Sequence, residues 1–221
     1  MSIRYGGILR LSLHELADVL QRAGYRIASP LPPRPYRGEV GGAISPLAHN
    51  NVVAVDVNTE RQVVGLTAIS LDHPLNKFIE ELEKIEKLIK EDLRLKAELM
   101  FYEVIAELRV ETGKNPLETF NNIASKCAEL SDVFEKVAGL TKQEVTLFNL
   151  RLRSKSYGPN DYTWLDLEVM PSVARPEIEY LITIVYRDQN IDRMRNLVTN
   201  IYEISSSIIK ALELKAYGKT T

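Results

Sequence analysis

Histidine and cysteine are the side chains most often used for metal binding and nucleophilic chemistry, and in this chain each of them stands alone. His14 falls inside an expected helix and His73 at the start of another, so we interpret both as surface or capping groups. His49 and Asp56 could meet across neighbouring strands and do acid–base chemistry. Cys127 lies on the apolar side of its expected helix, where an inert buried thiol is usual. The sequence therefore predicts no metal site and no cofactor.

Short motifs of known enzyme classes are also missing from the sequence. Gly113-Lys114 lacks the glycine-rich loop that cradles a phosphate, and no serine stands in a Gly-x-Ser-x-Gly turn. The glycine pairs at 6–7 and 41–42 lack the spacing of a dinucleotide-binding loop. Because an active site assembled from distant residues leaves no local trace, an enzyme with a distributed site stays an alternative hypothesis.

Positive charge and aromatic rings come together in one expected hairpin. Arg151, Arg153 and Lys155 lead into a turn that carries Tyr157 and Tyr162. Stacking of bases on such rings contributes about 1–3 kcal/mol per base, so this hairpin is a candidate site for single-stranded nucleic acid. The alternative is a tight turn at residues 158–160 flanked by ordinary surface arginines.

A second candidate lies in the stretch SPLPPRPYRGEVGG, residues 29–42. Its four prolines favour an extended, polyproline-like path that loses little entropy on ordering. Arg34, Tyr36 and Arg37 would then be displayed on a stiff arm that contacts a partner subunit or ligand. The alternative is a surface loop braced against its own domain.

Composition sets the class of protein. The chain has 221 residues, of which 45% are hydrophobic and 26% charged, typical of a soluble globular protein. A net charge of -2 lacks the basic excess of a protein that coats phosphates. No apolar run is long enough for a membrane span, the start has no signal-peptide pattern, and a single cysteine excludes an intramolecular disulfide. We expect a cytoplasmic protein with no membrane partner. The composition, with few Gln and many Glu–Lys pairs, resembles that of thermophilic proteins.

The first part of the chain predicts strands and two helices. GGILRL reads as a strand, and the helix after it begins at Ser12 with a capping box and ends at Gly24. Residues 41–47, 51–58 and 62–71 predict three antiparallel strands, with a hairpin turn at 58–61. The strand NVVAVDV is apolar on both faces, which implies cover on both sides. Residues 72–93 predict a helix with an apolar stripe of Phe78, Leu82, Ile85 and Ile89.

The second part predicts the same kinds of element. Residues 96–112 fit either a strand or a helix, and we choose a strand from about Met100. A helix begins at the cap Asn115 and runs to Gly139. Three strands follow at 144–155, 161–170 and 179–188, and a last helix covers 190–214.

The order strand, helix, three strands, helix therefore occurs twice. It predicts an α+β protein of two similar β-α-β-β-β-α halves, residues 1–95 and 96–221, with antiparallel sheets packed by helices. In architecture this order resembles the duplicated saddle of TATA-box-binding proteins, although no stretch of their sequence signature is present. The solvent-facing strand positions mix Arg151 and Arg153 with Asp166, Glu168 and Glu103, so they do not form a basic DNA-binding face.

These patterns favour a non-catalytic α+β scaffold that binds another macromolecule, through self-association as a homodimer. Binding of single-stranded nucleic acid by the Arg151–Tyr162 hairpin is one alternative. An enzyme with a distributed site is the other.

Overall fold

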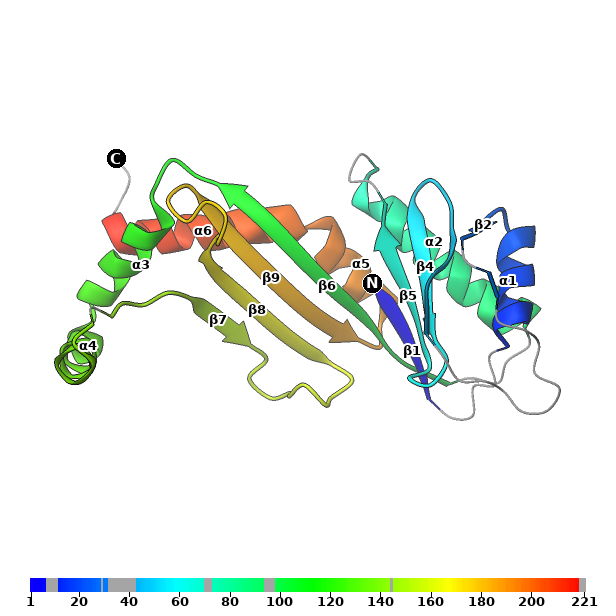
Figure 1. Ribbon diagram of the computed structural model, residues 1–221, viewed down its shortest axis with the longest axis horizontal. Helices are drawn as coiled ribbons and strands as arrows, with labels where there is room; N and C mark the ends of the chain where they lie inside the picture. Colours follow the sequence, from blue (N-terminus) through cyan, green and yellow to red (C-terminus); the bar gives the residue numbers. More distant parts are fainter. Residues whose placement is uncertain are drawn as a thin grey trace. The chain divides into compact units, whose positions relative to one another are not determined.

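A computed structural model gives the fold of residues 1–6, 12–28, 30–31, 43–69, 73–93, 98–143 and 145–218 (Figure 1). These residues form six α-helices, a π-helical turn and nine strands, which confirms the α+β class. The helices are α1 (Leu13–Arg22), α2 (Leu75–Lys87), α3 (Pro116–Ser125), α4 (Ala128–Thr141), α5 (Ile191–Thr199) and α6 (Ile201–Tyr217), and the π-helical turn η1 (Leu88–Asp92) follows α2.

All nine strands belong to one sheet of order β2-β3-β4-β5-β1-β6-β9-β8-β7. Each strand pair whose register is described runs antiparallel. The strands are β1 (Ser2–Gly6), β2 (Arg26–Ile27), β3 (Ala43–His49), β4 (Val53–Asn58), β5 (Val63–Ala68), β6 (Glu98–Glu111), β7 (Leu150–Arg153), β8 (Trp164–Pro171) and β9 (Glu179–Asp188).

The chain divides into two units, which we describe separately. Unit 1 contains Met1–Val104, Gly158–Trp164 and Tyr186–Thr199, and unit 2 contains Ile105–Tyr157, Leu165–Val185 and Asn200–Thr221. Strands β6, β8 and β9 therefore contribute residues to both units, β8 through Trp164 alone in unit 1. The described elements do not repeat the expected order fully, because four strands lie between α1 and α2 and three between α4 and α5. The internal duplication is not confirmed, and the division into residues 1–95 and 96–221 stays a prediction.

Unit 1 forms largely where the sequence pattern placed its elements. The Ser12 side chain caps α1 by accepting a hydrogen bond from the Glu15 N–H at 3.4 Å, and Gly24 has φ +95° after the helix end. The hairpin turn is closed by the Asn58 carboxamide, which accepts from the Arg61 N–H at 2.8 Å. A first strand lies at Ser2–Gly6, where alternate residues Ile3 and Tyr5 enter the core, and residues 7–11 of the strand expected at GGILRL lie outside the described residues.

Two details of unit 1 correct the sequence interpretation. In α2 the buried apolar residues are Ile79, Leu82 and Ile85, whereas Phe78 is only half-buried. Strand β4 buries Val53, Val55 and Val57 on one face, while its other face is half-exposed. The cover on both sides that we expected for this strand is therefore only partial.

The segment whose interpretation was ambiguous is divided between the units at Val104 and Ile105. Residues 98–111 are the strand β6, which buries Tyr102, Val104 and Leu108 at even-numbered positions and also Phe101. The cap Asn115 of α3 is also confirmed, since its carboxamide accepts from the N–H groups of Leu117 at 2.9 Å and Glu118 at 3.4 Å.

Both long helices expected in the second part are interrupted. Between α3 and α4 the backbone of Cys127 is extended (φ -114°, ψ 100°), so this half-buried residue precedes α4 and does not lie on a continuous helical stripe. The last helix is divided between α5 and α6 at Asn200 (φ -101°, ψ 9°). The strand expected at 144–155 shortens to β7, Leu150–Arg153.

Candidate interaction surface

Large apolar side chains are exposed mainly in unit 2. Among the described residues fourteen large hydrophobic side chains are exposed, and only Ile69 and Tyr162 of these belong to unit 1. The other twelve include three neighbours on α4 and three on α6. Single exposed apolar residues are ordinary, but clusters of them mark interaction sites, so the exposed cluster on α4 is one candidate surface. On α6 the candidate is the half-exposed pair Ile204 and Ile208, since the exposed Tyr202, Leu214 and Tyr217 do not line the pocket beside this pair.

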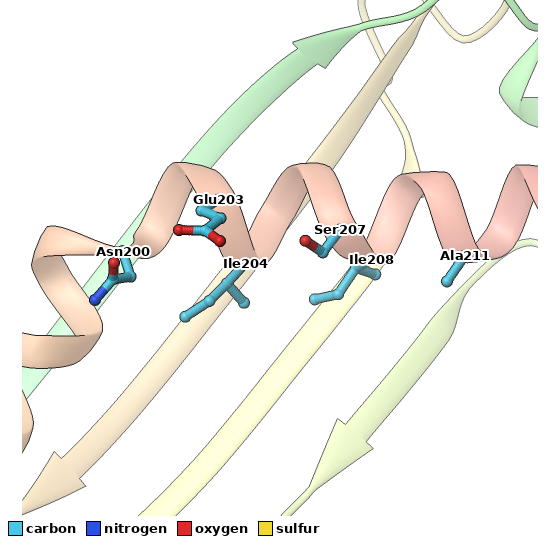
Figure 2. Close-up of a pocket in the computed structure, with 6 residues that line it drawn as sticks. All are labelled: Asn200, Glu203, Ile204, Ser207, Ile208 and Ala211. Carbon is cyan, nitrogen blue, oxygen red and sulfur yellow. The ribbon is translucent and has the colours of Figure 1, made fainter.

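Helix α6 has an apolar face that is wider than its contact with the rest of unit 2. One arc of the helix is buried and consists of Ile201, Ser205, Ile209, Leu212 and Ala216. The adjoining arc lines an open groove of about 530 Å³, and its residues are Asn200, Glu203, Ile204, Ser207, Ile208 and Ala211. Figure 2 shows Ile204, Ile208 and Ala211 projecting from the same side of the helix.

The groove contains two small residues, and two oppositely charged side chains lie along one of its sides. Ser207 and Ala211 are small, which permits close approach of another backbone. Along the exposed flank of α6, Glu203 lies near the N-terminal end and Lys210 lies two turns further on. Neither side chain has an ion-pair partner among the described residues, so both are available to a partner.

Helix α4 repeats this pattern in the same unit. Val133 is 53% exposed, Val137 37% and Leu140 79%, and these residues lie at spacings of four and three on one side of the helix. Only Phe134 and Ala138 are half-buried among residues 132–141, the part of α4 whose side chains are described. Most of the described apolar face of α4 is therefore uncovered.

The arginines of the predicted nucleic-acid hairpin are engaged within unit 2. The Arg151 guanidinium donates two hydrogen bonds to the Asp166 carboxylate, at 2.7 and 2.5 Å, and Arg153 lies 3.6 Å from the same carboxylate. The bond from Arg151 holds the pKa of Asp166 below its usual value, against the effect of burial. Lys155 is exposed and has no described partner, so it is the remaining cation of this hairpin.

The aromatic residues of the hairpin fall in different units. Tyr157 belongs to unit 2 and is 54% exposed. Tyr162 belongs to unit 1, where its ring lies 6.0 Å from the ring of Phe101. Tyr162 therefore lies in a different unit from Tyr157 and the arginines, and a single surface containing all of them is not established. Arg34, Tyr36 and Arg37 lie outside the described residues, and the contact role of their arm stays a prediction.

Arg187 holds the segment containing Tyr162 in unit 1. Its guanidinium donates to the Glu103 carboxylate and to the Pro159 carbonyl, and it lies 4.8 Å from the centre of the Phe101 ring and 5.5 Å from that of Trp164. These contacts occupy both the charge of Arg187 and the face of Phe101. We interpret the cluster as structural.

The pairing of His49 with Asp56 is wrong. His49 lies opposite Ala54 in the β3–β4 register. The Asp56 carboxylate instead accepts hydrogen bonds from Ser45 at 2.6 Å and Thr67 at 3.0 Å. His73 contacts the Asn51 carbonyl at 3.1 Å. Within the described ranges no group of three or more His, Cys, Asp and Glu residues could hold a metal ion.

Sequence reasoning missed the groove because it gave residues 190–214 as one helix and did not divide its apolar residues by side. Ile201 and Leu212 belong to the buried arc, whereas Ile204 and Ile208 belong to the groove. A helix that packs on one neighbour needs a single stripe, so the breadth of the apolar arc was the signal that could have found the groove.

Two further searches of the chain found nothing. No helix in the described part of the chain combines the length and apolar character needed to cross a membrane. Comparisons with protein-family models, curated proteins and solved structures find no match for this chain.

Proposed function

We propose that the protein is a non-catalytic α+β scaffold that binds another macromolecule, and that it does so by self-association as a homodimer. The observation that carries the proposal is the uncovered apolar surface of α4 and α6 in unit 2. Fully burying a Val, Leu or Ile side chain stabilises by about 1.5–3 kcal/mol. Several such side chains meeting in one interface therefore supply a driving force for association.

Edge-to-edge pairing of the sheet is a less favourable way to associate. Strand β7 stands at one end of the sheet order and carries Leu150, Arg151, Leu152 and Arg153. Opposite residues of an antiparallel pair point to the same face, so pairing Leu152 with its copy brings Arg151 against Arg153 of the other chain. Like charges directly across a strand pair are destabilising, and charged edges of this kind oppose aggregation. The helical surface is thus the better contact.

Light scattering of the full chain at micromolar concentration tests the proposal. We expect a dimer for the natural sequence and a monomer for Ile208→Glu, because the substitution places a charge in the apolar groove. Tyr202→Glu is the matched control, since Tyr202 is 55% exposed on another side of α6. A natural chain that is monomeric across this concentration range contradicts the proposal.

The nucleic-acid alternative makes a different prediction for the hairpin. Binding through Arg151 and Arg153 would require these side chains to leave Asp166 or to share their charge with it. The alternative expects an affinity for oligothymidylate that falls steeply with salt and with the double substitution Arg151→Ala and Arg153→Ala. Absent or salt-insensitive binding removes it. The distributed enzyme site stays a hypothesis that a bound substrate in converging polar residues would support.

A further inference from the structure

We infer that two copies of this chain associate through a reciprocal contact, which we call the helix exchange: α4 of each copy lies antiparallel in the α6 groove of the other. This inference rests on the proposed self-association and names its contact. It joins the two uncovered helical faces of unit 2 in one reciprocal, two-fold interface.

The apolar stripes of the two helices match in spacing. On α4 the exposed residues are Val133, Val137 and Leu140, and on α6 the groove residues are Ile204, Ile208 and Ala211. Both sets follow the pattern i, i+4, i+7, so they cover equal lengths of helix surface. The larger side chains of α4 would fill the space beside Ser207 and Ala211, as ridges of one helix fit the grooves of another.

The charges beside these stripes select the antiparallel direction. Asp132 precedes Lys136 on one flank of the α4 stripe, and Glu203 precedes Lys210 on the corresponding flank of the α6 groove. When two helices face each other antiparallel, these flanks lie on the same side, so Asp132 lies nearest to Lys210. Lys136 lies further along, toward Glu203, which the long lysine side chain would have to reach along the helix because Glu203 and Lys210 are spaced more widely than Asp132 and Lys136. A parallel arrangement would instead place the two flanks on opposite sides of the contact, where these oppositely charged residues could not pair. None of the four has an ion-pair partner among the described residues, so these pairs would cost no existing contact.

Within one copy, α4 is held away from the groove. The Lys126 ammonium, just before α4, donates to the carbonyls of Lys215 at 3.0 Å and Ala216 at 2.7 Å. The start of α4 therefore lies beside the C-terminal end of α6, whereas the groove lies between Asn200 and Ala211. Figure 1 shows α4 end-on and α6 side-on in the same unit. A second copy can supply α4 to the groove without breaking these bonds.

Cross-linking between differently tagged chains tests the exchange. In a Cys127→Ser background, one full-length chain carries Val137→Cys and a co-expressed chain of different tag length carries Ile208→Cys. We expect a short bis-maleimide to give a heterodimer band. Tyr202→Cys in place of Ile208→Cys is the control and should give at least tenfold less product.

The outcomes separate this inference from the proposed function. A dimer by light scattering without the Val137–Ile208 cross-link overturns the helix exchange and leaves self-association standing. A monomer overturns both. A cross-link that forms only inside one chain carrying both cysteines shows that α4 closes on its own groove, which also overturns the exchange.

Charge reversal gives a second readout that does not depend on cysteines. Asp132→Lys or Lys210→Asp alone should weaken the dimer, each by roughly twofold to fivefold in dissociation constant, the range for exposed ion pairs. The two substitutions in one chain should restore much of the loss. Additive losses in the double variant overturn the antiparallel pairing.

Discussion

Helices α2 in unit 1 and α6 in unit 2 are both amphipathic, yet the two units cover them to different extents. In α2 the side chains of Ile79, Leu82 and Ile85 are fully buried. Its polar side is tied to neighbouring segments of unit 1, since Glu81 accepts from Tyr25 and from Asn50, the latter at 2.9 Å, which lie just before β2 and just after β3. Glu86 accepts from Tyr102 of β6 at 2.7 Å. Helix α6 has a buried arc as well, but Ile204 and Ile208 beside it line an open groove.

This difference shows that the presence of an apolar arc on a helix does not tell how much of that arc its own unit buries. Unit 1 uses nearly all of its described apolar surface internally, with Ile69 and Tyr162 as the exposed large hydrophobics described there. Unit 2 leaves α4 and part of α6 open. We therefore expect the stability of unit 1 to depend on its own core and that of unit 2 to depend also on association.

The largest effect should come from the groove, because a charge placed there removes the interface. The unfolding midpoint of the natural chain should rise with protein concentration, since association stabilises the folded state by mass action. Ile208→Glu should abolish that rise, and for a micromolar dimer about 8 kcal/mol of association free energy is lost. Thermal unfolding of both proteins at several concentrations measures how the midpoint depends on protein concentration. A concentration-dependent midpoint that persists in the variant would place the contact elsewhere.

The next effect concerns the closed core of unit 1. Leu82→Ala should cost about 2–5 kcal/mol of unfolding free energy at every protein concentration, since Leu82 is fully buried. Val133→Ala in unit 2 is the contrast, because Val133 is 53% exposed and its loss should change the stability of the dilute monomer by at most about 0.5 kcal/mol. Urea unfolding at low concentration compares them. Equal losses would mean that α4 is covered within its own unit.

The sequence predicted what depends on local chemistry. Capping by Ser12 and Asn115, the turn at Asn58 and the alternation of β6 follow from neighbouring residues, and each is found in the structure. The interruptions at Cys127 and Asn200 carry no Pro or Gly, so helix propensity gave no signal for them. Which arc of α6 is covered depends on distant strands and helices, and periodicity cannot report that.

The helix caps give a smaller, local test in the two units. Asn115→Ala should cost about 1–2 kcal/mol, because its side chain accepts from two N–H groups of α3, the nearer at 2.9 Å. Ser12→Ala should cost about 0.5 kcal/mol, because the Ser12 cap of α1 has one bond at 3.4 Å. Chemical denaturation of each variant measures the loss, and the reverse ranking would contradict the cap geometry.

The smallest effect is the pH dependence that Asp166 gives to unit 2. The hydrogen bond from Arg151 lowers the pKa of the Asp166 carboxyl in the folded chain, while in the unfolded chain that pKa is about 3.9. Its stabilisation is therefore complete above pH ~4 and is lost as pH falls through the folded pKa. The variant Asp166→Asn should be less stable than the natural chain at pH 7, and the difference should fade in acid.

The expected size of this difference is small, because the Arg151 side chain is 46% exposed and salt screens its pair with Asp166. Thermal unfolding from pH 7 to pH 2 measures the difference, with Glu177→Gln at an exposed position as control. If the difference stays constant across this range, the substitution Asp166→Asn disturbs packing, and the ion pair contributes nothing measurable to the stability of unit 2.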